Sequence, residues 1–185
     1  DSSTSRGLGD VYKRQIIYSK DHGKTWNIST LARTNTTESQ VAEVEPGVLM
    51  LNMRDNRGGS RAVSTTTDLG KTWKEHESSR TALQEPVCMA SLISVKAKEN
   101  VLGKDILLFS NPNDAKNRHS ITIKASLDGG VTWLPENQLL LDAGWGWGYS
   151  CLTMIDKETV GILYESSVAH MTFQAIKLKD IIKTK

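Results

Sequence analysis

Short apolar runs separated by turn residues set the hydrophobic pattern of this chain. Runs of this length, rich in β-branched and aromatic residues, are typical of β-strands. Turn formers such as Pro46-Gly47 and Gly58-Gly59 lie between the runs. No amphipathic helix of about ten residues or more stands out, so the pattern predicts an all-β fold. The strand candidates are 16–18, 41–44, 48–53, 62–65, 89–95, 106–110, 120–125, 150–155, 160–164 and 171–176.

An eight-residue pattern, S/T-x-D-x-G-x-T-W, occurs three times, at 19–26, 66–73 and 126–133. Each copy follows a strand candidate and has the chemistry of a hairpin turn. Its aspartate can accept backbone N–H groups, its glycine can take a positive φ, and its Thr-Trp pair can begin the returning strand. We therefore interpret the three aspartates as structural residues rather than as catalytic acids or metal ligands: Asp21, Asp68 and Asp128.

Many short strands with one turn motif per roughly 50 residues are typical of a β-propeller. A propeller blade holds four strands, and a closed ring needs about four blades or more. About a dozen strands therefore make about three blades. The sequence predicts part of a propeller, with an open strand edge where further blades would pair.

The two ends of the chain differ from its middle. Residues 1–15 are polar and glycine-dotted, without the apolar segment of a signal peptide. We expect this tract to be non-native or truncated and leave it out of the fold, with a basic recognition arm as the alternative. Residues 16–177 are expected to form the propeller part with its three turn motifs. Residues 178–185 are expected to form a polar, lysine-rich tail.

Charge and composition exclude several classes of function. The chain has 23 Lys and Arg against 21 Asp and Glu, and this near balance gives no electrostatic case for nucleic acid or an acidic membrane. The longest apolar run, 48–53, is too short for a transmembrane segment. Cys88 and Cys151 are too few for a disulfide scaffold or a CxxC zinc site, so we interpret both as reduced core thiols. The four histidines lack metal-like spacing, and no metal site or cofactor is expected.

The repeated octapeptide resembles the Asp box of sialidases (neuraminidases), six-bladed β-propellers that remove terminal sialic acids. The sequence between the Asp boxes resembles bacterial exo-α-sialidases in family order, from about residue 16 to residue 173. The resemblance implies a sialidase-type propeller of which this chain is the C-terminal part. The matching segments are 38–41 with 48–55, 85–92, 149–153 and 161–165.

The resemblance also implies catalytic roles for individual residues. Tyr149 matches the nucleophilic tyrosine and Glu38 the general base that takes its proton. Arg54 and Arg118 match the second and third members of an arginine triad that binds the substrate carboxylate. Glu165 matches the glutamate that supports the first triad arginine.

Further residues near these motifs are assigned less directly. Asp55 lies beside Arg54 and is expected to contact substrate. Trp145 and Trp147, in a glycine-rich loop expected to be mobile, either wall the sugar pocket or cap a blade. No segment of this chain matches the family's first triad arginine or its acid/base aspartate.

The implied roles agree with elementary chemistry. A guanidinium binds a carboxylate through two parallel hydrogen bonds, which lysine cannot reproduce. A neutral phenol approaches a negative substrate without the repulsion that a carboxylate nucleophile meets, and sialidases are a known tyrosine exception among glycosidases. The pKa of an unperturbed phenol is about 10, so the phenol needs a base such as a glutamate.

The function implied is a retaining exo-α-sialidase acting on sialylated glycoproteins, glycolipids or oligosaccharides. A trans-sialidase, which passes the sugar to another sugar, stays open. A rival of a different class is a non-catalytic Asp-box propeller that binds glycans or proteins, and the chain by itself is expected to be an incomplete, inactive fragment. Family resemblance implies a periplasmic, cell-surface or secreted location.

Overall fold

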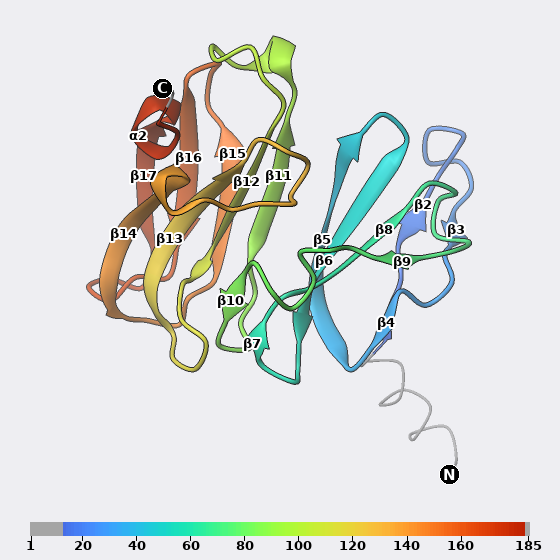
Figure 1. The fold of residues 1–185 in the computed structure, drawn as a ribbon, viewed down its shortest axis with the longest axis horizontal. Coiled ribbons are helices and arrows are strands. Elements are labelled where there is room, and N and C mark those ends of the chain that lie inside the picture. The colour runs from blue at the N-terminus through green and yellow to red at the C-terminus, as the bar shows by residue number, and fades with distance from the viewer. Residues whose placement is uncertain (1–12, 184–185) are drawn as a thin grey trace.

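The computed structural model describes residues 13–183, which form an almost entirely β structure (Figure 1). Three antiparallel sheets follow one another along the described chain, and each is a meander of neighbouring strands. The first contains β5 (Thr36–Glu45), β6 (Val48–Asp55), β8 (Ala62–Thr66) and β9 (Lys74–Glu75); the second contains β11 (Ser91–Val95), β12 (Ile106–Pro112), β13 (His119–Ser126) and β14 (Gln138–Trp145); the third contains β15 (Ser150–Met154), β16 (Thr159–Tyr164) and β17 (Thr172–Lys177).

Three two-stranded ladders complete the strands of the described region. They pair β1 (Lys13–Arg14) with β4 (Arg33–Thr34), β2 (Ile17–Tyr18) with β3 (Asn27–Ile28), and β7 (Gly59–Ser60) with β10 (Gln84–Glu85). Most of the tract 1–15 lies outside the described residues. Its last part contributes β1 to the first of these ladders, which corrects the expectation that the whole tract lies outside the fold.

The three sheets are arranged as the blades of an open propeller. Their first strands, β5, β11 and β15, contact one another in that order, while the later strands of each sheet lie farther out. Figure 1 shows the second and third sheets overlapping at the left and the first sheet at the right. Within residues 13–183 the sheets do not close into a ring, which confirms the predicted partial propeller of about three blades.

Apolar side chains fill the spaces between the sheets. One core cluster joins the second and third sheets through residues such as Leu108, Ile123 and Ile162, all fully buried. Another joins the first and second sheets around Met50 and Phe109. Burial of this apolar area is the main favourable contribution to folding, so each blade is stabilised chiefly by its neighbours.

The end of the described chain corrects one expectation. Residues 178–185 were expected to be a polar tail, but Leu178–Ile181 forms the short helix α2, and Leu178, Ile181 and Ile182 are buried in the core between the sheets. These three residues are spaced by three and four positions, so one helical turn brings them to the same face. No helix among residues 13–183 has the length and apolar character needed to cross a membrane.

The three Asp boxes are hairpin turns closed by their own side chains, as predicted. In the second box, Asp68 Oδ1 accepts the Thr72 N–H at 2.9 Å and Asp68 Oδ2 accepts the Thr72 hydroxyl at 2.7 Å. The same pairs of bonds occur in the first and third boxes. Gly70 has a φ of 77°, and a Cβ there would lie 2.4 Å from Ser29 Cβ, so both conformation and space require glycine.

Antiparallel pairing separates the two ends of the propeller. The Asp-box turns follow β2, β8 and β13, at one end of the sheets. At the other end, β5 begins opposite the end of β6, and β15 begins opposite the end of β16, through the pairs Thr36 with Asp55 and Ser150 with Tyr164. The predicted site residues lie close to this second end.

Candidate functional site

Three side chains from different parts of the sequence meet in one hydrogen-bonded cluster. The Tyr149 hydroxyl donates to Glu38 Oε1 at 2.5 Å. Arg54 Nη1 donates to Glu38 Oε2 at 2.6 Å and to the Tyr149 hydroxyl oxygen at 3.3 Å. The Arg54 and Glu38 side chains are 19% and 36% exposed, so the cluster is accessible but partly shielded from water.

The ends of three strands bring this cluster together. Glu38 lies near the start of β5, Arg54 near the end of the neighbouring strand β6, and Tyr149 just before β15 in the third sheet. The innermost strands of adjacent blades converge around the propeller axis, so residues at their starting ends approach one another. The inner strand β11 lies between β5 and β15, which it contacts on either side.

The cluster shifts the pKa values of Tyr149 and Glu38 in opposite directions. The hydrogen bond to Glu38 raises the pKa of the Tyr149 phenol above its usual value, and burial acts in the same direction. Burial by itself raises the pKa of Glu38, but the hydrogen bonds from Tyr149 and Arg54 outweigh it and lower that pKa below the usual value. The tyrosine is therefore neutral and the glutamate ionised in this arrangement.

Arg118 lies beside the same tyrosine. Its guanidinium carbon is 5.8 Å from the centre of the Tyr149 ring. Its two terminal nitrogens donate to the backbone carbonyl oxygens of Trp147 and Val87, at 3.0 and 3.1 Å. The structure thus brings Arg118 to the cluster through contacts with the loop that carries Tyr149.

Glu165 is also at the cluster, through the backbone. Its Oε2 accepts the Tyr149 N–H at 3.0 Å, and the Glu165 N–H donates to the Tyr149 carbonyl oxygen at 2.9 Å. A hollow of about 280 Å³ lies beside these two residues. Its lining is completed by Met89, Ser150, Cys151, Leu163 and Met171.

Asp55 is placed differently from the other predicted site residues. Its side chain is fully buried, and its carboxylate accepts hydrogen bonds from Arg57, at 3.1 Å, and from Arg80. It also accepts the backbone N–H of Arg57 at 2.9 Å. These contacts hold the turn that follows β6, and no hydrogen bond within residues 13–183 joins Asp55 to Arg54, Glu38 or Tyr149.

The backbone of the loop before Tyr149 is closely packed at its glycines. The Gly146 N–H donates to the Arg118 carbonyl oxygen at 3.0 Å. A Cβ on Gly148, whose φ is 86°, would lie 2.6 Å from Pro112 Cγ. Trp145 and Trp147 are 61% and 60% exposed, with their ring centres 5.5 Å apart. The glycines therefore serve close contact and turn geometry.

Sequence reasoning missed a buried ion pair directly behind the cluster. Arg61 and Glu85 are 1% and 0% exposed and form a salt bridge. Arg61 follows Gly58-Gly59 in a strand-like segment, and a charged residue at such a place needs a partner when it is buried. The position hinted at a partnered arginine, although the pattern did not indicate the partner.

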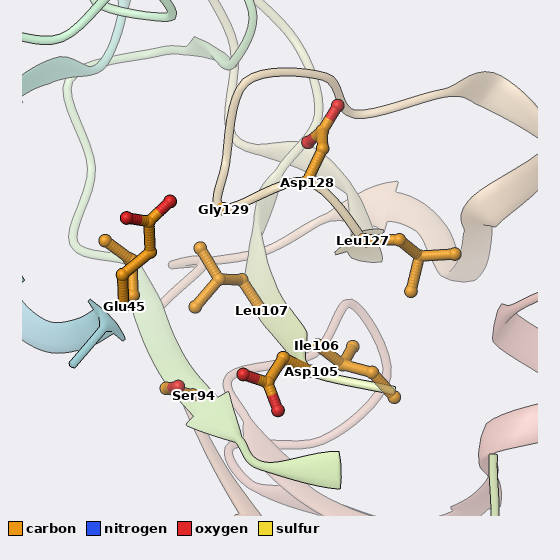
Figure 2. Close-up of a pocket in the computed structure, with 9 residues that line it drawn as sticks. Glu45, Ser94, Asp105, Ile106, Leu107, Leu127, Asp128 and Gly129 are labelled. Carbon is orange, nitrogen blue, oxygen red and sulfur yellow. The ribbon is translucent and has the colours of Figure 1, made fainter. Parts of the chain in front are cut away.

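A second hollow lies at the opposite end of the strands, beside the third Asp box (Figure 2). Its volume is about 230 Å³, and its acidic lining residues are Glu45, Asp105 and Asp128. Asp128 is held by Thr132 and Asp105 accepts the Ala97 N–H at 2.7 Å, so both carboxylates have structural partners. Within the described part of the chain, no group of three or more His, Cys, Asp or Glu residues is arranged to hold a metal ion.

The two cysteines behave differently. Cys88 is a buried free thiol, as expected, and burial raises its pKa to about 11. Cys151 is free but exposed, which corrects its interpretation as a core thiol. It follows the buried Ser150 on β15, where alternate residues face opposite sides of the sheet. The Cys151 side chain therefore faces away from the core.

Comparison with known proteins identifies relatives of this chain. Residues 3–162 match the family model described as a BNR repeat-like domain. The chain is 80% identical over 168 residues to a sialidase of Bacteroides fragilis, a match that covers 91% of this chain and 31% of that protein. The chain thus spans about a third of the length of that curated relative.

Solved structures give the same result. The Hadza microbial sialidase Hz136 superposes with a TM-score of 0.88 at 74% identity, covering 91% of this chain and 32% of that one. Trypanosoma rangeli sialidase, solved as a covalent intermediate with 2,3-difluorosialic acid, superposes with a TM-score of 0.69, covering 89% of this chain and 26% of that one. Its identity is 22%, so that likeness shows the fold alone.

Proposed function

Because the chain belongs to the BNR repeat-like family and, within it, to the sialidases, we propose that it carries the nucleophile and base of a retaining exo-α-sialidase. The substrates are terminal sialosides of glycoproteins, glycolipids or oligosaccharides. Tyr149 is the nucleophile, Glu38 its general base, and Arg54 and Arg118 bind the substrate carboxylate.

The observation that carries the proposal is the 2.5 Å hydrogen bond from the Tyr149 hydroxyl to Glu38. A general base must lie within about 3 Å of the group whose proton it takes. A glycan-binding propeller without catalysis needs no phenol bonded to an ionised carboxylate. The pair therefore favours an enzyme over the binding module.

The first chemical step makes a covalent intermediate. The Tyr149 oxygen attacks the anomeric carbon while the bond from that carbon to the leaving oxygen breaks. The phenol proton passes to Glu38, and the leaving oxygen takes a proton from an acid that lies outside the residues assigned here. A substrate carboxylate bound to Arg54 weakens the salt bridge from that arginine to Glu38. The pKa of Glu38 then rises, and Glu38 becomes a stronger base.

The second step returns the site to its starting state. Water attacks the anomeric carbon and loses a proton to the conjugate base of that acid. The bond from carbon to the Tyr149 oxygen breaks, and the phenolate recovers its proton from Glu38. Two inversions at one carbon give overall retention of configuration.

The test uses a chimera in which this chain replaces the matching 168 residues of the Bacteroides fragilis sialidase. We expect the chimera to hydrolyse sialyllactose, and Tyr149→Phe to lower its kcat by roughly 10³-fold or more. A fluorinated sialosyl reagent should label the peptide that contains Tyr149, as read by mass spectrometry. The 185-residue chain alone should be inactive on sialyllactose, because none of its residues is assigned as the acid. Acid catalysis typically contributes about 10²- to 10⁴-fold to the rate.

The matched control is Tyr164→Phe. Tyr164 is 2% exposed, and its hydroxyl accepts a hydrogen bond from Gln174 at 2.9 Å rather than bonding to Glu38. This variant should keep both turnover and labelling. Normal turnover by the Tyr149→Phe chimera, or a label on another residue, would exclude Tyr149 as the nucleophile.

A further inference from the structure

Both terminal nitrogens of Arg118 are held by backbone carbonyl groups. Nη1 donates to the Trp147 carbonyl oxygen at 3.0 Å, and Nη2 donates to the Val87 carbonyl oxygen at 3.1 Å. Each terminal nitrogen has two N–H donors, so one donor on each remains. Two donors on one planar guanidinium match the two oxygens of a carboxylate. The carbonyl groups therefore hold the guanidinium without using up its capacity to bind a ligand.

Val87, which supplies one of these carbonyl groups, has an unusual backbone conformation. Its φ is 55°, in the left-handed region that β-branched residues rarely adopt. Such strain persists only where the surroundings impose it, and it is commonly found at functional sites. The strained peptide unit is the one whose oxygen accepts from Arg118.

The buried Arg61–Glu85 ion pair contacts residues on both sides of Val87. Arg61 Nη1 donates to the Glu85 carboxylate and, at 2.8 Å, to the Cys88 carbonyl oxygen. Its Nε donates to Asn52 Oδ1 at 2.7 Å. One guanidinium thus fixes residues on both sides of Val87 and ties them to the neighbouring strand β6.

We propose that Arg61, Glu85 and Val87 are positioning residues for carboxylate recognition. The Arg61–Glu85 pair holds the 85–88 loop so that the Val87 carbonyl group orients Arg118 toward the carboxylate on the reacting carbon of the substrate. This inference rests on the proposed function, since it takes Arg118 as a carboxylate-binding residue. It adds a set of buried residues that do not touch the substrate and act through Arg118.

The informative variant is Val87→Gly. Glycine adopts a positive φ without strain, so this change removes the constraint on the loop and should leave the fold intact, with a Tm that is unchanged or higher. The matched control is Leu69→Gly, because Leu69 has a φ of 59° in the second Asp box at the opposite end of the sheets. The control relieves the same kind of strain away from Arg118.

The first measurement needs no enzyme activity. The 185-residue chain is treated with phenylglyoxal, and the labelling rate of each arginine is followed by peptide mass spectrometry, with Arg33 as the internal reference. Val87→Gly should raise the labelling rate of Arg118 severalfold, whereas Leu69→Gly should leave it unchanged. An unchanged rate at Arg118 in Val87→Gly overturns the inference.

The second measurement uses the chimera. Val87→Gly should raise KM for sialyllactose roughly three- to tenfold with kcat little changed, because the lost interaction is present in both ground and transition states. It should also reduce the preference for a 2,3-unsaturated sialic acid inhibitor over its C1 carboxamide, and Arg61→Lys should reduce it too. A merely structural role would leave this preference intact in any folded variant, and that result would refute the inference.

The two measurements separate the two proposals. A chimera without any turnover contradicts the proposed function, while the labelling of Arg118 still decides whether Val87 holds its guanidinium. Turnover with an unchanged inhibitor preference in Val87→Gly supports the proposed function and rejects the positioning role.

Discussion

Lys124 is a charged residue enclosed between the first and second sheets. It is 2% exposed, and its Nζ lies 5.7 Å from the centre of the Phe109 ring. Burial lowers its pKa from 10.5 to about 7, although the charge of Glu85 acts in the opposite direction. The folded chain therefore holds this proton less tightly than the unfolded chain, and the charge costs native stability at neutral pH.

Replacing Lys124 by methionine should stabilise the fold. At pH 7 the free energy of unfolding should rise by roughly 1–4 kcal/mol, because a buried charge is exchanged for an apolar chain. Between the folded pKa of about 7 and the unfolded value of 10.5, the wild type gains stability as pH rises, since its unfolded state binds the extra proton. The advantage of Lys124→Met should therefore shrink from pH 7 to pH 10.

Denaturant unfolding at both pH values measures this effect. Lys116→Met, at an exposed position, is the matched control and should show little change at either pH. A Lys124→Met variant that is less stable than the wild type at pH 7 would contradict the assignment of an unfavourable buried charge.

Prediction from sequence was least complete for the contacts and burial of single residues. The motif order led to Tyr149, Glu38 and Arg54, whose side chains meet as expected. The burial of Arg61 and Lys124 was not predicted, because a charged residue within a strand looks the same in sequence whether it faces water or a neighbouring blade. Burial and partners depend on how sheets stack, which no local pattern contains.

The Asp-box hairpin is an element that stabilises itself. Hydrogen bonds from Thr25 and Thr72 lower the pKa of Asp21 and Asp68 to about 2. Because these folded-state values lie below the unfolded value of 3.8, the stabilisation is complete above about pH 4 and is lost as the pH falls toward 2.

Asp68→Asn should therefore reduce the acid sensitivity of the fold. The wild type should lose Tm between pH 4 and pH 2, and the variant should start from a lower Tm at pH 5 and lose less over the same interval. Differential scanning calorimetry at a series of pH values measures both quantities. Asp180→Asn, in α2, serves as the control and should follow the wild type; an identical acid profile for Asp68→Asn would count against the hairpin as the titrating element.

Strands formed by apolar runs were predictable as elements, and each of the ten candidates overlaps a strand of the structure. The eight-residue strand β14 (Gln138–Trp145) was missed. It is an outer strand whose residues are half-buried or exposed, and its three leucines at 139–141 are soon followed by Asp142 and Gly144. Its pairing with β13, rather than its own composition, makes it a strand.

The molecule as a whole exposes an apolar row on its third sheet. The register aligns Cys151, Leu163 and Phe173 across β15, β16 and β17. Leu163 and Phe173 are 40% and 60% exposed, on the side of the sheet that faces away from the core. A contiguous apolar face of this kind is characteristic of a surface that packs against another surface.

We expect the isolated chain to self-associate through this face. Phe173→Lys should shift the association to higher protein concentration, because a charge on the row must be desolvated on contact. Sedimentation velocity over a range of concentrations measures the effect. Trp26→Lys, at a residue that is 65% exposed in the first Asp box, is the control. A chain that stays monomeric at all concentrations, or equal effects of both variants, would disprove this role of the face.

The hydrogen bond between Glu38 and Tyr149 joins residues 111 positions apart in the chain. During synthesis at about 5–20 residues per second, the proposed base is made roughly 5–20 s before the proposed nucleophile. A nascent chain that ends before Tyr149 can have its first two sheets in place and still lack any phenol beside the glutamate. In the cell, the proposed nucleophile would therefore reach its base late in translation, only after the ribosome has released the segment that carries Tyr149.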